Sequence, residues 1–345
     1  MAGNMNAKPR RVTLRMIADE VGVDVSTVSR VINSPASEAS RWASPSVVER
    51  IKGVAISNGY KRNPHAASLR TNRSEFVGVV VPRLQDFVLA TVFEGIEESA
   101  SKHDYSAFVA NSLDLPDLHR KRAESLLDRR VDGLIIGDAH YKEPYLDELD
   151  RRGVPFVLVN RHAGTRYLSA TTDDVLGGEL AAEHLLSLGR ERPCIVGGQL
   201  FASTFRDRSK GFRSVYREAG IDISDAHIVD GPFDAAGGRT AMETLLDRGV
   251  RPDSIFAPND FAAIAAMGVL RERGFVVPDD VAVVGYNDTP LAAELTMPLT
   301  TVSSPMYEMG AQGFELLWRR LEGQDPASVR LVPRLAARAS TLGRG

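Results

Sequence analysis

The chain has 345 residues, of which 25% are charged and 43% hydrophobic, and this ordinary globular composition excludes a largely disordered or fibrous protein. The length exceeds what one hydrophobic core usually holds, so it favours a small domain joined to a larger, two-lobed one. The net charge of −3 hides an asymmetry, because residues 1–75 hold 12 Lys and Arg against 6 Asp and Glu while the remainder holds 30 against 39. A basic head on an acidic body is typical of a head that meets a polyanion.

The cysteine count and the start of the chain indicate the compartment. Cys194 is the single cysteine, so a disulfide framework and a thiolate metal site are both excluded, which fits a reducing compartment. The polar start MAGNMNAKPRR is followed by no apolar signal region, and the longest apolar runs are too short to span a bilayer. We therefore expect a cytoplasmic protein without membrane contact.

Residues 12–60 are expected to form a bundle of three short helices, preceded by a flexible basic arm at residues 1–11. Thr13 is a suitable N-cap for the first helix, Gly22 ends it, and Asp24 is a suitable N-cap for the second. Ser44-Pro45 predicts the start of a third helix, which ends near residues 58–59. Two helices joined by a glycine turn form a helix-turn-helix unit.

The second helix has one face to bury and one to expose. Val28 and Val31 fall on one side, whereas Ser26 and Arg30 point away. Its tip, Val25-Ser26 with Arg30 one turn further on, is small enough to enter a DNA major groove, where arginine can pair bidentately with guanine O6 and N7. Such units also occur in proteins that never meet DNA, so charge and spacing alone leave DNA binding open.

Residues 61–75 are expected to form a hinge helix and linker. Asn63 can cap a helix that has Pro64 at its first position, but this helix is shorter than the roughly 12–15 residues that are marginally stable alone. It should therefore fold only against a partner. Leu69, with arginines on both sides, suits an apolar wedge that enters a minor groove, and packing on the next domain is the alternative.

Three segments carry a family resemblance. VTLRMIADEVGVDVSTVSRVIN, NGYKRNPHAASLR and FVGVVVP closely resemble the lac repressor/galactose repressor (LacI/GalR) family of bacterial transcription regulators. The resemblance implies that Val25, Ser26 and Arg30 read bases, that Thr27 and Ser29 lie near phosphates, and that Leu69 is the hinge-helix wedge. The DNA-contacting residues that we predict are Thr13, Val25, Ser26, Thr27, Ser29, Arg30, Asn63, His65 and Leu69.

The head departs from the family pattern at three places. Asp24 replaces the usual serine cap, Met16 stands where an acid is usual, and the loop of residues 34–43 is several residues longer than usual. We expect this loop to be a solvated insertion. A DNA-backbone contact through Arg41 or Trp42 is the alternative.

From residue 76 on, short apolar runs alternate with helical patterns, which predicts βαβ units and parallel sheets covered on both faces. The pattern restarts near residue 176, so we expect two lobes with a cleft between them and a chain that crosses more than once. The predicted strands are FVGVVV, YSAFVA, DGLIIG, PFVLVN, PCIVGG, HIVD, SIFAP, VAVVGY, LTTVSS and residues 329–331. The predicted helices are residues 89–102, 118–129, 144–151, 176–187, 204–219, 241–247, 261–273 and 306–321.

Polar residues follow several of these strands. Ligands of open α/β sheets bind beyond the carboxyl ends of the strands, and convergent polar groups with an aromatic cover suit a polyhydroxylated ligand. The predicted effector-binding residues are Asp86, Asn160, Arg161, Thr204, Arg208, Phe233, Asn259 and Asn287. Asp260 follows the same rule, but we expect it to serve first as a helix cap.

The family resemblance extends to this part of the chain. RSKGF, APND and VVGYND resemble effector-pocket segments of the LacI/GalR family, whose body has the periplasmic-binding-protein (type I) fold. By this resemblance Thr204, Arg208, Phe233, Asn259 and Asn287 fall on effector-contacting positions. Residues 86–89 read DFVL where many members have Asn-Pro-Phe-Phe, Gly-Arg at 189–190 replaces a common Gly-His, and Asn287 stands where an acid is frequent, so no named effector is implied.

Catalytic motifs are missing from the sequence. Neither GxGxxG nor GxxxxGK[ST] occurs, no histidine pair has metal-binding spacing, and no serine lies in a GxSxG elbow. Asp173-Asp174 resembles a carboxylate pair, but we interpret it as structural. We predict no catalytic residue, no metal site, no cofactor and no enzyme activity.

The sequence thus predicts a small all-α helix-turn-helix DNA-binding head (residues 12–60) and an α/β two-lobed periplasmic-binding-protein-like (type I) effector-binding and dimerisation domain (residues 76–345). The predicted function is that of a homodimeric or larger repressor of genes for uptake or catabolism of a sugar or related small molecule. An inducer would release it from double-stranded, pseudo-palindromic operator DNA. The alternatives are a small-molecule receptor without DNA function, an α/β enzyme, and a regulator that uses a co-repressor.

Overall fold

The computed structural model describes residues 12–34, 38–60 and 73–342. The chain divides into two compact units, residues 1–74 and 75–345, which we call the head and the body. Among the described residues, no helix is both long and apolar enough to cross a membrane.

The head consists of short helices whose ends follow from local sequence. They are α1 (Leu14–Val21), α2 (Val25–Asn33), the 3-10 helix η1 (Ala39–Arg41) and α3 (Pro45–Ser57). The Oγ1 of Thr13 accepts a hydrogen bond from the backbone N–H of Met16, and the Asp24 carboxylate accepts one from the N–H of Ser26 at 2.7 Å. Gly22 ends α1 at a positive φ of 75°, which glycine adopts without steric cost. The predicted helix ends at Thr13, Gly22 and Asp24 are confirmed, and Ser44 precedes α3 as predicted but its side chain makes no cap hydrogen bond.

In residues 38–43, the described end of the extended loop of the head, most side chains are exposed, as expected of a solvated insertion, but one residue anchors the loop to the core. Ala39 is fully buried in the core that Ile17, Val28 and Ile51 also form. The Trp42 ring lies against the guanidinium of Arg30 on α2. The anchor was not predicted, because the small apolar Ala39 gave no periodic signal, although the turn that contains it packs against α2 and α3.

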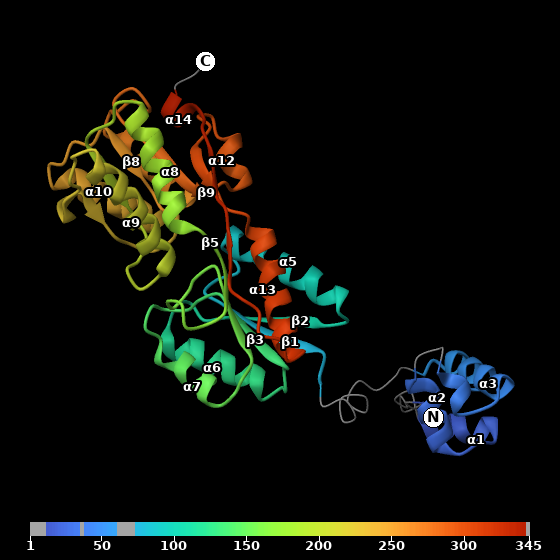
Figure 1. The fold of residues 1–345 in the computed structure, drawn as a ribbon. Helices are drawn as coiled ribbons and strands as arrows, with labels where there is room; N and C mark the ends of the chain where they lie inside the picture. Colours follow the sequence, from blue (N-terminus) through green and yellow to red (C-terminus); the bar gives the residue numbers. More distant parts are fainter. Residues whose placement is uncertain (1–11, 35–37, 61–72, 343–345) are drawn as a thin grey trace, which may run out of the picture. The chain divides into compact units, whose positions relative to one another are not determined.

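The first lobe of the body is a parallel sheet covered by helices on both faces (Figure 1). In the described residues its strand order is β11-β5-β4-β3-β1-β2. The strands are β1 (Phe76–Val81), β2 (Ser106–Asn111), β3 (Gly133–Ile136), β4 (Phe156–Val159), β5 (Ser169–Thr172) and β11 (Val329–Leu331). Helices α5 (Phe87–Lys102) and α13 (Met306–Leu321) cover one face, and α6 (Pro116–Leu127) and α7 (Pro144–Arg151) cover the other.

The second lobe repeats this plan with the strand order β12-β10-β9-β8-β6-β7. Its strands are β6 (Pro193–Val196), β7 (Ile228–Val229), β8 (Ser254–Phe256), β9 (Ala282–Asn287), β10 (Thr300–Ser303) and the antiparallel edge strand β12 (Arg334–Ala336). Helices α8 (Asp174–Ser187) and α9 (Ser203–Glu218) cover one face, and α10 (Ala235–Asp247) and α11 (Asp260–Glu272) the other. The short elements η2 (Asp225–His227), α12 (Pro290–Glu294) and α14 (Ala339–Leu342) complete it.

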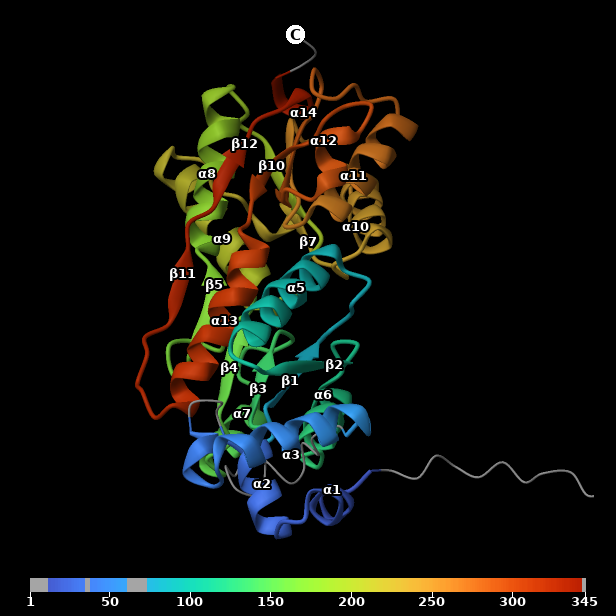
Figure 2. The same ribbon diagram turned by 90° about the vertical axis from the view of Figure 1, so that its right-hand side faces the viewer.

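In each lobe one helix pair packs at very close range. A Cβ built on Gly310 of α13 would lie 1.9 Å from the carbonyl oxygen of Val92 on α5, and one on Gly211 of α9 would lie 1.9 Å from that of Val175 on α8. Only glycine permits this backbone approach. The pairing places α13 beside α5, although more than 200 residues separate them in the chain (Figures 1 and 2).

Within residues 73–342, the chain crosses between the lobes at three places, after β5, after β10 and after β11. The crossings are tied to one another, because the Thr172 and Ser304 hydroxyls are 2.7 Å apart and the Asp173 N–H donates to the Leu331 carbonyl at 2.8 Å. The expectation of repeated crossing is confirmed. The prediction did not include β5, whose sequence SATT lacks the apolar run expected of a buried strand, nor β12.

Candidate ligand cavity and nucleic-acid interface

A cavity of about 500 Å³ lies between the lobes, where the loops that follow the strands of both sheets converge. It is lined by all eight predicted effector-binding residues: Asp86, Asn160, Arg161, Thr204, Arg208, Phe233, Asn259 and Asn287. Because the two sheets point the carboxyl ends of their parallel strands toward it, side chains distant in sequence meet there.

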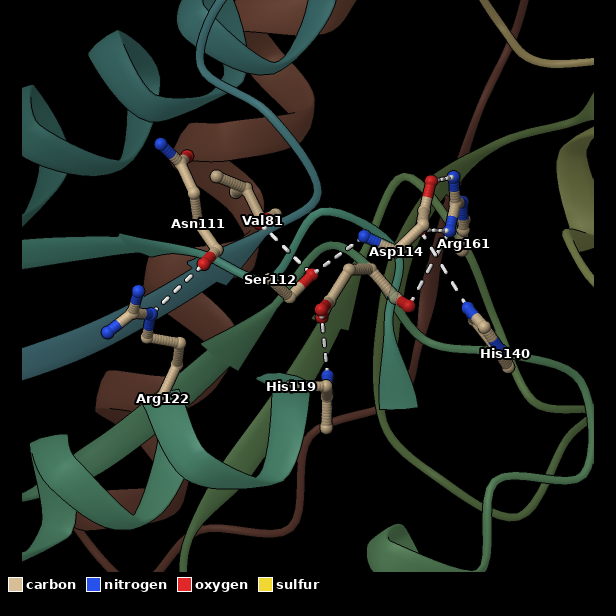
Figure 3. A network of polar contacts seen from close by, with 9 residues as sticks. Val81, Asn111, Ser112, Asp114, His119, Arg122, His140 and Arg161 are labelled. Carbon is tan, nitrogen blue, oxygen red and sulfur yellow. Dashed lines mark hydrogen bonds and ion pairs between the residues drawn. The ribbon is translucent and has the colours of Figure 1, made fainter. Parts of the chain in front are cut away.

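Arg161, just beyond β4, forms the polar wall of the first lobe. Its guanidinium donates from both terminal nitrogens to the Asp114 carboxylate, at 2.6 and 3.1 Å (Figure 3). The same guanidinium faces the rings of Phe201 and Phe233, with centroids 5.6 and 5.5 Å away. A bidentate pair held between aromatic faces keeps the arginine in one orientation.

Asp114 keeps its charge at neutral pH. Burial alone would raise its pKa, but the nearby His140, whose Nε2 lies 3.8 Å away, and the charge of Arg161 outweigh burial and lower the pKa of Asp114 to about 2. Asp114 and the preceding Leu113 both have positive φ, 57° and 58°. This conformation is unfavourable for side-chain-bearing residues, and the Arg161 pair compensates part of its cost.

Arg208 on α9 forms the corresponding wall of the second lobe. Its Nε donates to Asp174 at 2.8 Å and its Nη1 to the carbonyl of Pro258 at 2.6 Å. Its Cζ lies 3.6 Å from the centroid of the Tyr286 ring. Arg208 and Asp174 are both buried, so the carboxylate neutralises an arginine that solvent scarcely reaches.

Two asparagines present buried polar atoms that have no protein partner. The Oδ1 of Asn259 caps α11 by accepting the Ala262 N–H at 2.8 Å, while its Nδ2 is unpartnered among the described residues. The Oδ1 of Asn287 is likewise unpartnered there. Buried polar atoms usually find a partner, so a donor and an acceptor on the cavity wall are suited to hydroxyl groups of a ligand.

The expected cap role of Asp260 is wrong, because Asn259 occupies the N-cap position one residue earlier. Asp260 instead accepts hydrogen bonds from the N–H and hydroxyl of Thr289 and from the hydroxyl of Thr301. Burial raises its pKa to about 6, against the lowering effect of these bonds. Asp260 thus ties α11 to the loop after β9.

The remaining predicted residues are placed as follows. Asp86 is the N-cap of α5, accepting the Val88 N–H at 3.0 Å, and burial raises its pKa. Asn160 turns the chain after β4 at a φ of 64°. Thr204 is buried in the first turn of α9. These residues therefore shape the cavity while also fixing local backbone.

Cationic and anionic side chains are balanced around the cavity. Arg161 and Arg208 are each paired with a carboxylate, so neither is a free cation. The charged lining residues are Arg83, Asp86, Asp114, Arg161, Arg208 and Asp234. No group of three or more His, Cys, Asp or Glu in the described part of the chain could hold a metal ion. The cavity is therefore suited to a neutral, hydroxyl-rich ligand.

The exposed face of α2 is the candidate nucleic-acid interface in the head. Val25, Ser26 and Arg30 are exposed, whereas Thr27 and Ser29 are half-buried. Val28 and Val31 are buried on the opposite side, as the periodicity predicted. Thr13 is exposed at the start of α1, and the predicted contacts Asn63, His65 and Leu69 lie outside the described residues.

Comparisons with known proteins agree with this architecture. A model of the periplasmic-binding-protein-like domain matches residues 182–341. The HTH-type transcriptional regulator DegA of Bacillus subtilis (strain 168) is 32% identical over 337 residues, which cover 96% of this chain and 98% of DegA. The chain belongs to the LacI/GalR family.

Two further LacI/GalR-type proteins show the same extent of likeness. The ribose operon repressor of Escherichia coli (strain K12) is 30% identical over 311 residues, covering 90% of this chain and 93% of that repressor. The solved structure of the transcriptional regulator CelR in complex with cellobiose is 31% identical, with a TM-score of 0.72 over 96% of this chain and all of that one.

Several cavity residues of this LacI/GalR chain were not predicted. Asp114 follows β2, while Gln199 and Phe201 follow β6. The rule that selected residues after the other strands would have found them if it had also been applied to YSAFVA and PCIVGG. Asp174, which we interpreted as structural, accepts a hydrogen bond from Arg208 but does not itself line the cavity.

At the rim of the cavity, residues of the two lobes touch directly. The Nε2 of His162 lies 2.7 Å from the Asp207 carboxylate, and the His162 N–H donates to the Ser203 hydroxyl at 2.9 Å. The Arg206 guanidinium stacks on the Tyr141 ring at 3.6 Å. Any ligand that changes the angle between the lobes must rearrange these contacts.

Proposed function

We propose that this LacI/GalR-family protein is a transcriptional repressor whose operator binding is controlled by a neutral saccharide in the interlobe cavity. One observation carries the proposal. The same chain exposes Val25, Ser26 and Arg30 on a capped helix and encloses a charge-balanced cavity with the unpartnered amide groups of Asn259 and Asn287.

The likeness to DegA and to the ribose operon repressor supports the regulatory role. The cellobiose in the CelR complex supports a saccharide as the ligand class. Paired arginines suit neutral hydroxyls better than an anion, because their charges are already neutralised by Asp114 and Asp174. We place the protein in the cytoplasm, where it would meet DNA.

The proposed mechanism is linkage between the cavity and the head. A saccharide that bonds to both lobes favours one lobe arrangement, and the rim contacts His162–Asp207 and Arg206–Tyr141 change with it. The protein would act as a homodimer on a pseudo-palindromic operator, and the hinge of residues 61–75 would carry the change to the heads.

The first experiment identifies the ligand. A panel of neutral mono- and disaccharides that includes cellobiose is screened by thermal shift, since a ligand at 100 times its Kd stabilises the folded protein by about 2.7 kcal/mol. Charged sugar phosphates and sugar acids serve as controls and should give smaller shifts. If only the charged compounds shift the melting temperature, the neutral-ligand proposal is wrong.

The second experiment tests the coupling. Operators are selected from a random duplex library, and binding is measured at several salt concentrations with and without the saccharide that gave the largest shift. We expect a steep salt dependence and weaker operator binding when the saccharide is present. Tighter binding would identify a co-repressor instead, and the absence of sequence-selective binding would refute the regulatory proposal.

A further inference from the structure

We propose that Trp42 positions the guanidinium of Arg30 for base reading, so that the extended loop of the head helps to determine operator specificity. The inference rests on the proposed DNA-binding function. It starts from one contact, in which the Cζ of Arg30 lies 4.6 Å from the centroid of the Trp42 ring. Tryptophan is the aromatic side chain that attracts a guanidinium most strongly.

The Trp42 ring has a fixed support. The backbone N–H of Trp42 donates to the carbonyl of Ala39 at 3.1 Å, which closes the turn of η1. Ala39 is in turn fully buried in the head core. The ring therefore sits on a short, anchored turn, although Trp42 as a whole is 44% exposed.

The stacked arrangement leaves the recognition atoms of Arg30 available. A ring that covers one face of the guanidinium does not use its N–H donors, which all point outward in the guanidinium plane. Bidentate pairing with guanine O6 and N7 requires two of those in-plane donors. Among the described residues the Arg30 side chain forms no hydrogen bond or ion pair, so its N–H donors are not occupied within the head. The Arg30 charge acts on the Asp24 carboxylate only through space, where it helps to lower the pKa of Asp24.

Holding the side chain in advance should improve binding. A free arginine loses rotamer freedom when it is immobilised at an interface, and a pre-positioned arginine loses less. We expect the gain to be about three- to tenfold in operator affinity, on the scale of one immobilised side chain. The gain should be confined to the base pair that Arg30 reads.

The test uses the full-length protein and a set of operators in which each half-site position is changed to every other base pair. The variants are Trp42→Ala, Trp42→Phe, Arg30→Ala and the double variant, with Ile56→Ala as control. Ile56 is exposed on α3, so it reports the effect of removing an unrelated apolar side chain from the head.

We expect Trp42→Ala to weaken binding to the best operator three- to tenfold and to reduce base discrimination only at the position that Arg30→Ala also relaxes. The operator affinity and base discrimination of Trp42→Phe should lie between those of Trp42→Ala and those of the native protein. Adding Trp42→Ala to Arg30→Ala should change little, because the two act as one unit. The salt dependence should stay unchanged, since no phosphate contact is lost.

Two results would overturn the inference. In one, Trp42→Ala weakens binding equally on all sequences and lowers the salt dependence, which indicates a phosphate contact by the loop. In the other, discrimination at the Arg30 position is unchanged. If Arg30→Ala itself leaves base preference unchanged, Arg30 does not read a base, and the role of Trp42 is refuted with it. If neither the native protein nor any variant binds operators selectively, the proposed function is wrong.

A second measurement does not depend on DNA. The sequence has two tryptophans, so in a Trp318→Phe background the fluorescence reports Trp42 alone. We expect Arg30→Ala to change the Trp42 emission intensity in the free protein, because the stacked cation is removed. An unchanged emission would show that the contact does not persist in solution, and the inference would be overturned.

Discussion

Replacing Asp174 by asparagine tests whether the buried ion pair behind the cavity holds Arg208 in place. The substitution keeps the shape of the side chain but leaves the guanidinium without its counter-charge. Removing one partner of a buried pair typically costs about 3–5 kcal/mol of unfolding free energy. Because Arg208 keeps its hydrogen bond to Pro258 and its stacking on Tyr286, we expect a loss near the lower figure, about 3 kcal/mol.

The assay is urea unfolding of the native protein, Asp174→Asn, Arg208→Met and the double variant. Removing both charges should restore part of the stability that Asp174→Asn loses, because no uncompensated charge is then buried. If Asp174→Asn costs less than about 1 kcal/mol, or if the losses of the two single variants simply add, Asp174 does not compensate the buried charge of Arg208.

The pH dependence of Arg208→Met gives an independent check. Burial raises the pKa of Asp174 even beside Arg208, and loss of the arginine raises it further. A carboxyl whose pKa is raised by folding contributes stability at low pH that is lost as the pH rises through its folded pKa. Arg208→Met should therefore be more destabilised at pH 8 than at pH 5, and the opposite order would refute the reasoning.

Three further predictions concern the body. Asn259→Ser keeps an N-cap for α11 but removes the free amide, so saccharide affinity should fall about 5- to 30-fold by calorimetry with little change in stability. Gly178→Ala places a Cβ 2.0 Å from a backbone oxygen of α9 and should lower the unfolding free energy, measured in urea, by about 2–3 kcal/mol. Gly268→Ala has its nearest neighbouring atom at 3.7 Å and should raise the unfolding free energy by about 0.5–1 kcal/mol. The contribution of Asp260 is present below about pH 3.8 and lost as the pH rises through about 6. Asp260→Asn should therefore remove a decline of about 2.4 kcal/mol in the unfolding free energy between pH 4 and 7.

The features that the sequence predicted well are those with a local signal. Thr13 and Asp24 cap the starts of helices, and Gly22 ends one. Each makes its hydrogen bond to a residue at most four positions away, so the local sequence determines its role. Alternating apolar strands and amphipathic helices located most of both sheets. The rule that ligands bind beyond the carboxyl ends of the strands then predicted that Asp86, Asn259 and the other selected residues would line one cavity, as they do.

The features that were missed depend on contacts distant in sequence. Strand β5 consists of Ser, Ala and Thr, and it is recognisable only from its parallel partners β4 and β11. Asn259 and Asp260 are equally good caps in isolation, and only Thr289 and Thr301 decide between them. The contact between Trp42 and Arg30 was not predicted, because the two residues lie on different segments of the head.

The second crossing, by which the chain returns to the first lobe after β10, has a consequence for how the protein is made. Helix α13 supplies Phe314 and Leu317 to the core of the first lobe, and β11 supplies an edge strand of its sheet. Both segments follow nearly all of the second lobe in the sequence. On the ribosome, the first lobe therefore emerges early, but the sheet face that α5 and α13 share stays partly uncovered until the second lobe has been synthesised. Chaperone dependence during translation should thus be concentrated in the first lobe, and truncation before residue 306 should leave that lobe unfolded rather than isolate it as a domain.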